Sequence, residues 1–284
     1  MRLDLVALFS GVLLLSTKIA AFEPEAWLKS SYGGQASGIE TAELDTAQQL
    51  FLQTFRLGVN DALVQAWQKI GFELTVITFQ GEKFASIREL SEQKRGRGAY
   101  LIRLQDWKTP VLQAPHRYFD KKTGELLMQL FLEAPFKAAA WNTVHRKELD
   151  LAKQPNSYFT AFAKAQLASY PASLLVQLHG YAASKRITAS GRASSIIISA
   201  GHKWPGKRHR RLTECLQQRL TDKAMLYPVR TPELGGTRNP VGHVFHEAGA
   251  DNFLHLEVAA PLRQQLVEDR QALDTLSSCL MEAH

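Results

Sequence analysis

The segment SLLVQLHG, residues 173–180, places a histidine and a glycine directly after an apolar run. The leucines and valine of residues 173–178 predict a buried strand. In open α/β sheets, ligands bind beyond the carboxyl ends of the strands. His179, which follows this strand, is therefore a candidate functional residue.

Strands and helices alternate along the rest of the chain. We expect further strands at residues 73–79, 99–103, 111–114, 137–141, 195–199 and 253–258. We expect helices at residues 43–69, with a candidate break at Gly58, and at 124–133, 157–169, 209–220 and 261–273. Residues 82–97 are a charged stretch to which we assign no element. This alternation requires crossover connections, so we predict an α/β fold with a mixed, largely parallel sheet flanked by helices.

Residues 1–21 have the pattern of a signal peptide. Arg2 gives a positive start, residues 6–15 are mostly apolar, and the alanines at 20–21 offer small residues for cleavage. The apolar run is too short to span a bilayer comfortably. We expect a single domain over residues 22–284, periplasmic or secreted, with no membrane span after signal removal. An uncleaved N-terminal helix is the alternative.

Charge and cysteine content narrow the range of partners. The 34 basic and 27 acidic residues give a net charge of +7, which favours anionic partners. The basic run at residues 203–211 is more typical of a solvated loop entering a helix, and without a nucleic-acid motif we expect no nucleic-acid partner. Cys215 and Cys279 are too few for a four-thiolate zinc site. One disulfide and two free buried thiols both remain open.

Two histidines and two carboxylates near predicted strand ends have the chemistry of metal ligands. His116 and His179 each come just after an apolar strand. Catalytic zinc typically takes three protein ligands, drawn from imidazole and carboxylate, and keeps one position for water. His116, His179 and either Asp120 or Glu125 therefore form a candidate site for one Zn²⁺ ion. Each residue alone has a plainer explanation, as a turn histidine, a turn-forming aspartate or a helix-start glutamate.

Short motifs in this chain resemble the zinc carboxypeptidase superfamily. They lie within about residues 100–270 and are Ala114-Pro115-His116, Thr123-Gly124-Glu125, Leu178-His179-Gly180 and Leu256-Glu257 with Leu262-Arg263. The likeness is closest to phage-type poly-γ-glutamate hydrolases and N-formylglutamate amidohydrolases. Asp120, in one turn with His116, matches the carboxypeptidases, and Glu125 matches the pattern of N-acetylmuramoyl-L-alanine amidases. We rank Asp120 first, because spacing within one tight turn constrains geometry more.

The resemblance also implies roles for residues around the metal. The family draws its general base from the last strand, and Glu257 occupies that place. Strand alternation puts His255 on the same face as Glu257, near the site. The family has an asparagine and an arginine between its two histidine motifs, where Asn142 and Arg146 lie. Arg238 is a further candidate for binding a substrate carboxylate.

Two classes of function follow. The first is an exported, zinc-dependent peptidase or amidohydrolase that acts on a peptide, an acylated amino acid or a cell-wall-type substrate. The second is a non-catalytic exported module of the same fold that binds an anionic polymer. Metal content separates the two, because only the enzyme requires the ion.

Overall fold

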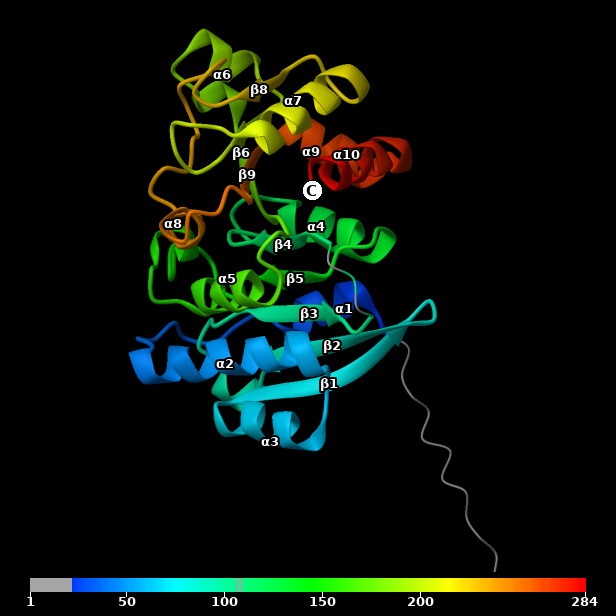
Figure 1. The fold of residues 1–284 in the computed structure, drawn as a ribbon, viewed down its shortest axis with the longest axis vertical. Coiled ribbons are helices and arrows are strands. Elements are labelled where there is room, and N and C mark those ends of the chain that lie inside the picture. Colours follow the sequence, from blue (N-terminus) through cyan, green and yellow to red (C-terminus); the bar gives the residue numbers. More distant parts are fainter. Residues whose placement is uncertain (1–21, 106, 108) are drawn as a thin grey trace, which may run out of the picture.

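The computed structural model describes residues 22–105, 107 and 109–284. The predicted signal peptide, residues 1–21, lies outside the described residues. None of the described helices combines the length and the apolar character that crossing a membrane requires. The chain folds around one large sheet with helices on both faces (Figure 1).

A nine-stranded sheet organises the chain in the order β1-β2-β3-β5-β4-β6-β9-β7-β8. Its strands are β1 (Phe72–Phe79), β2 (Glu82–Glu89), β3 (Ala99–Arg103), β4 (Val111–Ala114), β5 (Ala138–Trp141), β6 (Leu175–Tyr181), β7 (Ile196–Ser199), β8 (Ala224–Leu226) and β9 (Phe253–Ala259). The central strands β5, β4, β6 and β9 are parallel to one another. Antiparallel pairs join β1, β2, β3 and β5 on one side and β9 to β7 on the other. The predicted α/β fold with a mixed sheet flanked by helices is confirmed, and the parallel pairing is concentrated at its centre.

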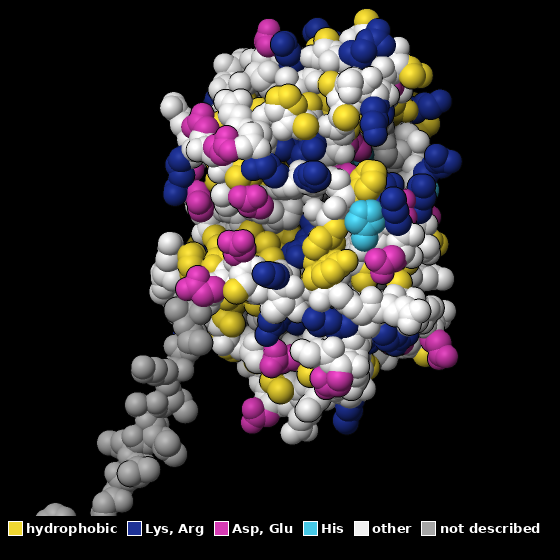
Figure 2. All heavy atoms as spheres, turned by 180° about the vertical axis from the view of Figure 1, so that it is seen from behind, with side chains coloured by type: hydrophobic (Ala, Val, Ile, Leu, Met, Phe, Trp, Pro, Cys, Tyr) yellow, Lys and Arg dark blue, Asp and Glu magenta, His cyan; other side chains and the backbone are white. Residues whose placement is uncertain are grey.

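Helices form a layer on each face of the sheet. They are α1 (Pro24–Ser30), α2 (Thr41–Leu57), α3 (Asp61–Lys69), α4 (Thr123–Glu133), α5 (Tyr158–Ser169), α6 (Ala189–Ala193), α7 (Lys207–Arg219), α8 (Pro240–Glu247), α9 (Ala260–Glu268) and α10 (Arg270–Ala283). The core on one face includes residues of α1, α4, α7, α9 and α10. The core on the other face includes residues of α2, α3, α5 and α8. Lys and Arg side chains are spread over the whole face seen in Figure 2, with Asp and Glu side chains among them.

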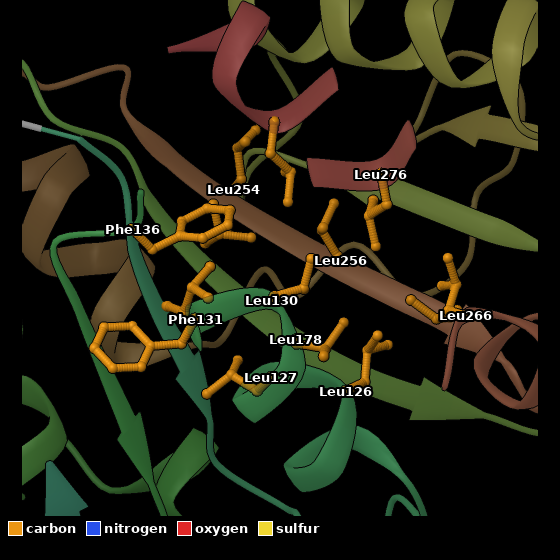
Figure 3. Packing of buried hydrophobic residues seen from close by; sticks show 14 of the residues in the cluster. Leu126, Leu127, Leu130, Phe131, Phe136, Leu178, Leu254, Leu256, Leu266 and Leu276 are labelled. Atoms are coloured by element: carbon orange, nitrogen blue, oxygen red, sulfur yellow. The ribbon is translucent and has the colours of Figure 1, made fainter. Parts of the chain in front are cut away.

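Alternating side chains give the central strands two different faces. Leu178, Leu254 and Leu256 pack on one face against leucines of α4 and α9 (Figure 3). The opposite face begins apolar, with Leu175 and Phe253. Towards the carboxyl ends of β6 and β9 it becomes polar, with Gln177, His179, His255 and Glu257. Because successive side chains alternate, these four polar residues share one face of the sheet.

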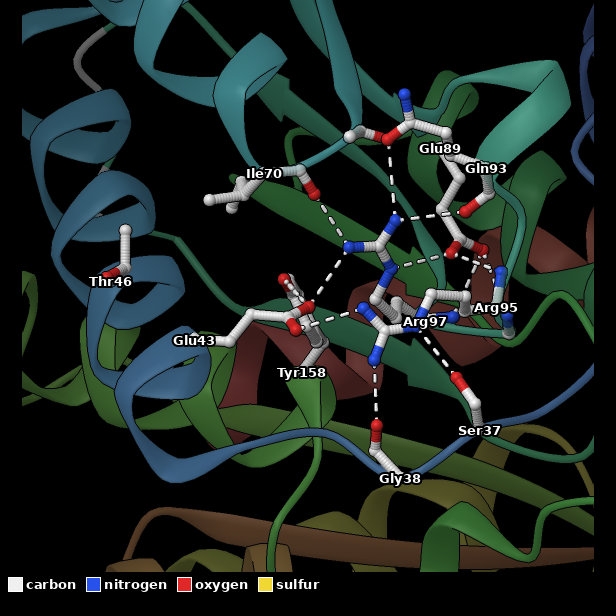
Figure 4. A network of polar contacts seen from close by, with 12 residues as sticks. Ser37, Gly38, Glu43, Thr46, Ile70, Glu89, Gln93, Arg95, Arg97 and Tyr158 are labelled. Atoms are coloured by element: carbon white, nitrogen blue, oxygen red, sulfur yellow. Dashed lines mark hydrogen bonds and ion pairs between the residues drawn. The ribbon is translucent and has the colours of Figure 1, made fainter.

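A largely buried ion-pair network joins α2 and α5 to β2 and to the segment that precedes β3 (Figure 4). Arg97 donates a hydrogen bond to Glu89 at 2.7 Å and another to Glu43 at 3.0 Å. Tyr158 donates to the same Glu43 carboxylate at 2.8 Å. Burial alone would raise the pKa of Glu43, but hydrogen bonds from Tyr158, Arg95 and Arg97 lower it. The charges of this network are therefore paired, as buried charges require.

Three segments differ from the elements that we expected. Residues 43–69 form two helices, because Gly58 ends α2 with a φ of 73°. The charged stretch 82–97 contains β2, whose apolar residues between the charges are buried and which pairs with β1. The expected helix 261–273 is two helices, because Asp269 has extended backbone angles and caps α10.

A disulfide links the last helix to α7. Cys215 of α7 and Cys279 of α10 are bonded across a separation of 64 residues. Both helices contribute to the same core. Of the two alternatives that the sequence left open, the structure contains the disulfide.

Replacing both cysteines by alanine is expected to lower the free energy of unfolding by about 2–4 kcal/mol, because the bridge restricts the unfolded chain. Urea denaturation of the wild type and the variant, each with and without reductant, measures the effect. Reductant should destabilise only the wild type. Titration of two free thiols in denatured, unreduced wild-type protein would contradict the pairing.

Candidate metal centre

The carboxyl ends of the central strands meet at one edge of the sheet. His116 follows β4, His179 lies in β6, and Glu257 lies in β9. Because these strands are parallel neighbours, the three side chains come from adjacent positions in the sheet. Sequence analysis placed His179 beyond its strand, whereas β6 continues to Tyr181.

A tight turn after β4 brings Asp120 beside His116. The carbonyl of His116 accepts hydrogen bonds from the backbone N–H groups of Phe119 at 2.9 Å and Asp120 at 2.8 Å. Asn142, which follows β5, accepts the N–H of Arg117 at 2.8 Å. The turn is thereby fixed to the neighbouring strand. His116 and Asp120 are both buried.

Hydrogen bonding determines which nitrogen of His116 carries the proton. Its Nε2 lies 2.7 Å from Oδ1 of Asp150. An ionised carboxylate only accepts hydrogen bonds, so the neutral ring has its proton on Nε2. Nδ1 is buried and has no hydrogen-bond partner among the described residues. Its lone pair is available to a metal ion, and the bond to Asp150 orients the ring as in many metal sites.

A chain of side-chain amides determines the tautomer of His179. Gln113 donates to the carbonyl of Phe159 at 3.2 Å, and its Oε1 accepts from Gln177 at 2.9 Å. Gln177 therefore presents its own Oε1, 2.9 Å from Nε2 of His179. Asn239 donates to that same oxygen. The carbonyl of Phe159 can only accept, so each hydrogen bond in this chain has a fixed donor and a fixed acceptor. Nε2 of His179 is therefore the donor to Gln177, and the ring has its proton on that nitrogen.

Three electron-pair donors consequently face one point. Oδ2 of Asp120 lies 3.6 Å from Nδ1 of His116 and 3.7 Å from Nδ1 of His179. These separations are too long for hydrogen bonds. They are close to the roughly 3.3 Å between ligands that surround a tetrahedral ion at about 2 Å. The residues present therefore fit a divalent cation, and the Gly180 N–H holds Oδ2 of Asp120 in place at 3.0 Å.

Charges at the centre also suit a cation. Burial alone would raise the pKa of Asp120, but its contacts with His116 and His179 hold that pKa well below the usual range. Burial lowers the pKa of His179, so its ring stays neutral. For His116, contacts with Asp120 and Asp150 outweigh burial and raise the pKa. Because metal ligands must be deprotonated, a metal ion would compete with a proton for Nδ1 of His116.

Glu257 and His255 lie beside this group on β9. The ring centroids of His255 and His179 are 4.5 Å apart, and Nε2 of His255 lies 3.9 Å from Oε1 of Glu257. His179, His255 and Glu257 form a second set of possible ligand atoms within 4.8 Å of one another. Burial, followed by the negative charge of Asp120, raises the pKa of Glu257 to about 8. Such a carboxyl group can exchange a proton near neutral pH, as acid–base catalysis requires.

A cleft of about 810 Å³ opens over the centre. The carboxylates that line it are Asp120, Asp150 and Glu257, which all belong to the site. The other charged residues of its lining are basic, and Lys121, Lys153, Lys185 and Arg238 among them are exposed. Such a lining attracts negatively charged groups.

The residues that we expected to contact substrate fall into two groups. Arg146, Arg238 and His255 line the cleft, and Arg146 also donates to Asp150 at 2.9 Å. Asn142 does not line it. Its amide is buried and bonds to backbone groups of Arg117 and Val144. Its role is therefore corrected from substrate contact to support of the His116 turn.

Glu125, the alternative carboxylate ligand, lies away from the centre. It is exposed in the first turn of α4 and is not among the residues that line the cleft. The helix begins at Thr123 and buries the opposite side of this turn. Of the two candidates, Asp120 is the one beside the histidines.

Two supporting residues were missed by the sequence analysis. Gln177 precedes His179 by two positions on one strand, a spacing that does predict a shared face. Asp150 lies 34 residues after His116. Nothing in the sequence connects those two, because their contact depends on the path of the loop after β5.

Comparisons with known proteins find structural likeness only. No family model and no curated protein matches the chain. A zinc-free apo structure of YndL is 16% identical with a TM-score of 0.41, covering 69% of this chain and 93% of its own. The gene product Atu2144 from Agrobacterium tumefaciens is 13% identical with a TM-score of 0.45, covering 63% and 90%. A bacteriophage poly-γ-glutamate hydrolase is 12% identical with a TM-score of 0.42, covering 68% and 90%.

The two candidate carboxylates give a matched test of the metal centre. Asp120→Asn should weaken Zn²⁺ binding by more than the roughly 10–100-fold that substitutions of supporting residues cost, because an amide is a poor ligand. Glu125→Gln removes the same charge from an exposed site and should leave zinc affinity unchanged. Competition with a chromogenic chelator measures both affinities. Equal affinity of the two variants would remove Asp120 from the ligand set.

Proposed function

We propose that this protein is an exported, zinc-dependent hydrolase of amide bonds in carboxylate-bearing substrates. One observation carries the proposal: Nδ1 of His116, Nδ1 of His179 and Oδ2 of Asp120 converge, while oxygen acceptors hold the outer nitrogens of both rings. This set of donors matches a catalytic zinc site with a position left for water.

Glu257 is the general base of the proposed reaction. A zinc ion held by His116, His179 and Asp120 would supply polarisation of the scissile carbonyl and acidification of a water molecule. Glu257 would accept a proton from the attacking water and return it to the leaving amine. The pKa of about 8 describes the metal-free protein, and a nearby cation would lower it into the range of a base.

The walls of the cleft support an anionic substrate. Arg238 is exposed and lines the cleft, and Lys121, Lys153 and Lys185 line other parts of it. A guanidinium can bind a carboxylate through two parallel hydrogen bonds. Peptides or acylated amino acids that carry carboxylates fit this lining, and acidic cell-wall peptides belong to the same chemical class.

Export is supported by two features of the chain. Residues 1–21 have the composition of a signal peptide. The bond between Cys215 and Cys279 suits an oxidising compartment. We therefore propose a periplasmic or secreted location.

Glu257→Gln is expected to bind zinc with nearly wild-type affinity and to lose roughly 10²–10⁴-fold in kcat, because the amide cannot accept the proton of water. Release of amine from an acidic dipeptide or an N-acylglutamate measures turnover. Zinc content and melting temperature of the variant serve as controls. Unchanged turnover would remove Glu257 from the mechanism, and a wild type without bound metal would favour a binding module instead.

Arg238→Glu is expected to raise KM for an acidic substrate several-fold at low salt, because it replaces attraction by repulsion. Lys223→Glu makes the same change of charge at an exposed residue outside the cleft and should leave KM unchanged. Steady-state kinetics with an acidic peptide and its neutral amide analogue measure the effect. An equal rise for both substrates would argue against charge recognition by Arg238.

A further inference from the structure

Arg263 of α9 is a buried cation beside the metal centre to which the proposed reaction assigns no role. Its side chain lines the cleft although the residue is only 7% exposed. Nε donates to the carbonyl of Lys121 at 2.9 Å. Nη1 donates to the carbonyl of Tyr181 at 3.4 Å and also to that of Val258. One guanidinium thus bonds to three backbone segments.

These segments are the ones that carry the site. Lys121 directly follows Asp120, and Val258 directly follows Glu257. Tyr181 lies two residues after His179 on the same strand. A guanidinium is planar and rigid, so its donors set the relative positions of the three carbonyls. Contact with Arg263 therefore couples the position of a proposed ligand turn to the two strands beside it.

Gly180 provides the space in which the guanidinium lies. A methyl group at residue 180 would lie 2.5 Å from Cζ of Arg263, which is far inside normal contact distance. The N–H of the same glycine donates to Oδ2 of Asp120 at 3.0 Å. Gly180 thus contacts Arg263 through its Cα side and Asp120 through its nitrogen. A side chain at residue 180 would therefore have to displace the guanidinium from its present position.

We propose that Arg263 is a positioning residue that holds the Asp120 turn, the end of β6 and the end of β9 in the arrangement that binds metal, with Gly180 as the surface against which it lies. The catalytic part of this inference rests on the proposed function. The packing part does not, because it concerns contacts between protein groups alone. Burial lowers the pKa of Arg263 while Asp120 and Glu257 counteract that shift, in agreement with their closeness.

Arg103 is a matched control for the arginine. It is 1% exposed and donates to three carbonyls, those of Phe131, Ala134 and Phe136. It does not line the cleft. Arg103 also pairs with Glu82, and its loss reports the cost of removing a buried arginine away from the metal centre.

The first experiment compares Arg263→Ala and Arg263→Lys with Arg103→Lys. Both changes at 263 should weaken Zn²⁺ binding and lower kcat by roughly 10–100-fold with little change in KM, as loss of a supporting residue does. Methylguanidinium should partly restore zinc affinity and kcat to Arg263→Ala. Arg103→Lys should lower the melting temperature and leave zinc affinity unchanged. Variants at 263 that lose only melting temperature, as Arg103→Lys does, would overturn the proposal.

The second experiment is a double-mutant cycle. Gly180→Ala should by itself weaken zinc binding, because the new methyl group displaces the guanidinium. In the Arg263→Ala background the same change should cost little, because the space is vacant. The cycle is also measured as melting temperatures of the metal-free protein. If the wild type binds no zinc, the proposed function fails while this cycle still decides the packing, and additive losses there would overturn the role of Gly180.

Discussion

An electrostatic constraint governs this site: two imidazole lone pairs and a carboxylate oxygen face one another in a buried space. Negative charge and lone pairs in such a place are stable only beside a compensating positive charge. Asp150 behind His116 and Gln177 behind His179 enforce the arrangement, because they keep the protons on the outer nitrogens. The centre is therefore specified as much by the groups behind the rings as by the donors themselves.

The strands β6 and β9 satisfy this constraint because each has one apolar face and one polar face. Leucines of β6 and β9 fill the core against α4, while the intervening residues of the same strands present polar groups on the other face. Hydrogen bonds from Gln177 through Gln113 to the carbonyl of Phe159 connect this polar face to α5. The alternation of side chains along β6 and β9 thus forms both the core and the site, and the helices on the two faces of the sheet stabilise both.

Sequence alone predicted those features that depend on local pattern. Apolar runs at 111–114 and 173–178 indicated β4 and most of β6, and the parallel arrangement then brought His116, Asp120 and His179 together. Features that depend on tertiary contact were not predictable. Charged residues concealed β2, whose buried side chains depend on the neighbouring β1 and β3. Motif likeness could not separate Glu125 on the outside of a helix from Asp120, nor reveal Asp150 behind His116.

Because β6 and β9 carry core residues on one face and site residues on the other, few changes in these strands are tolerated during evolution. Inserting or deleting one residue in β6 would send Leu178 towards the cleft and His179 into the leucine core, destroying both at once. Changes that alter the cleft and leave these strands intact would therefore fall in the connecting segments around Lys121, Lys153, Lys185 and Arg238, which line the cleft. Related chains should differ most in the length and charge of these segments while retaining the strands unchanged.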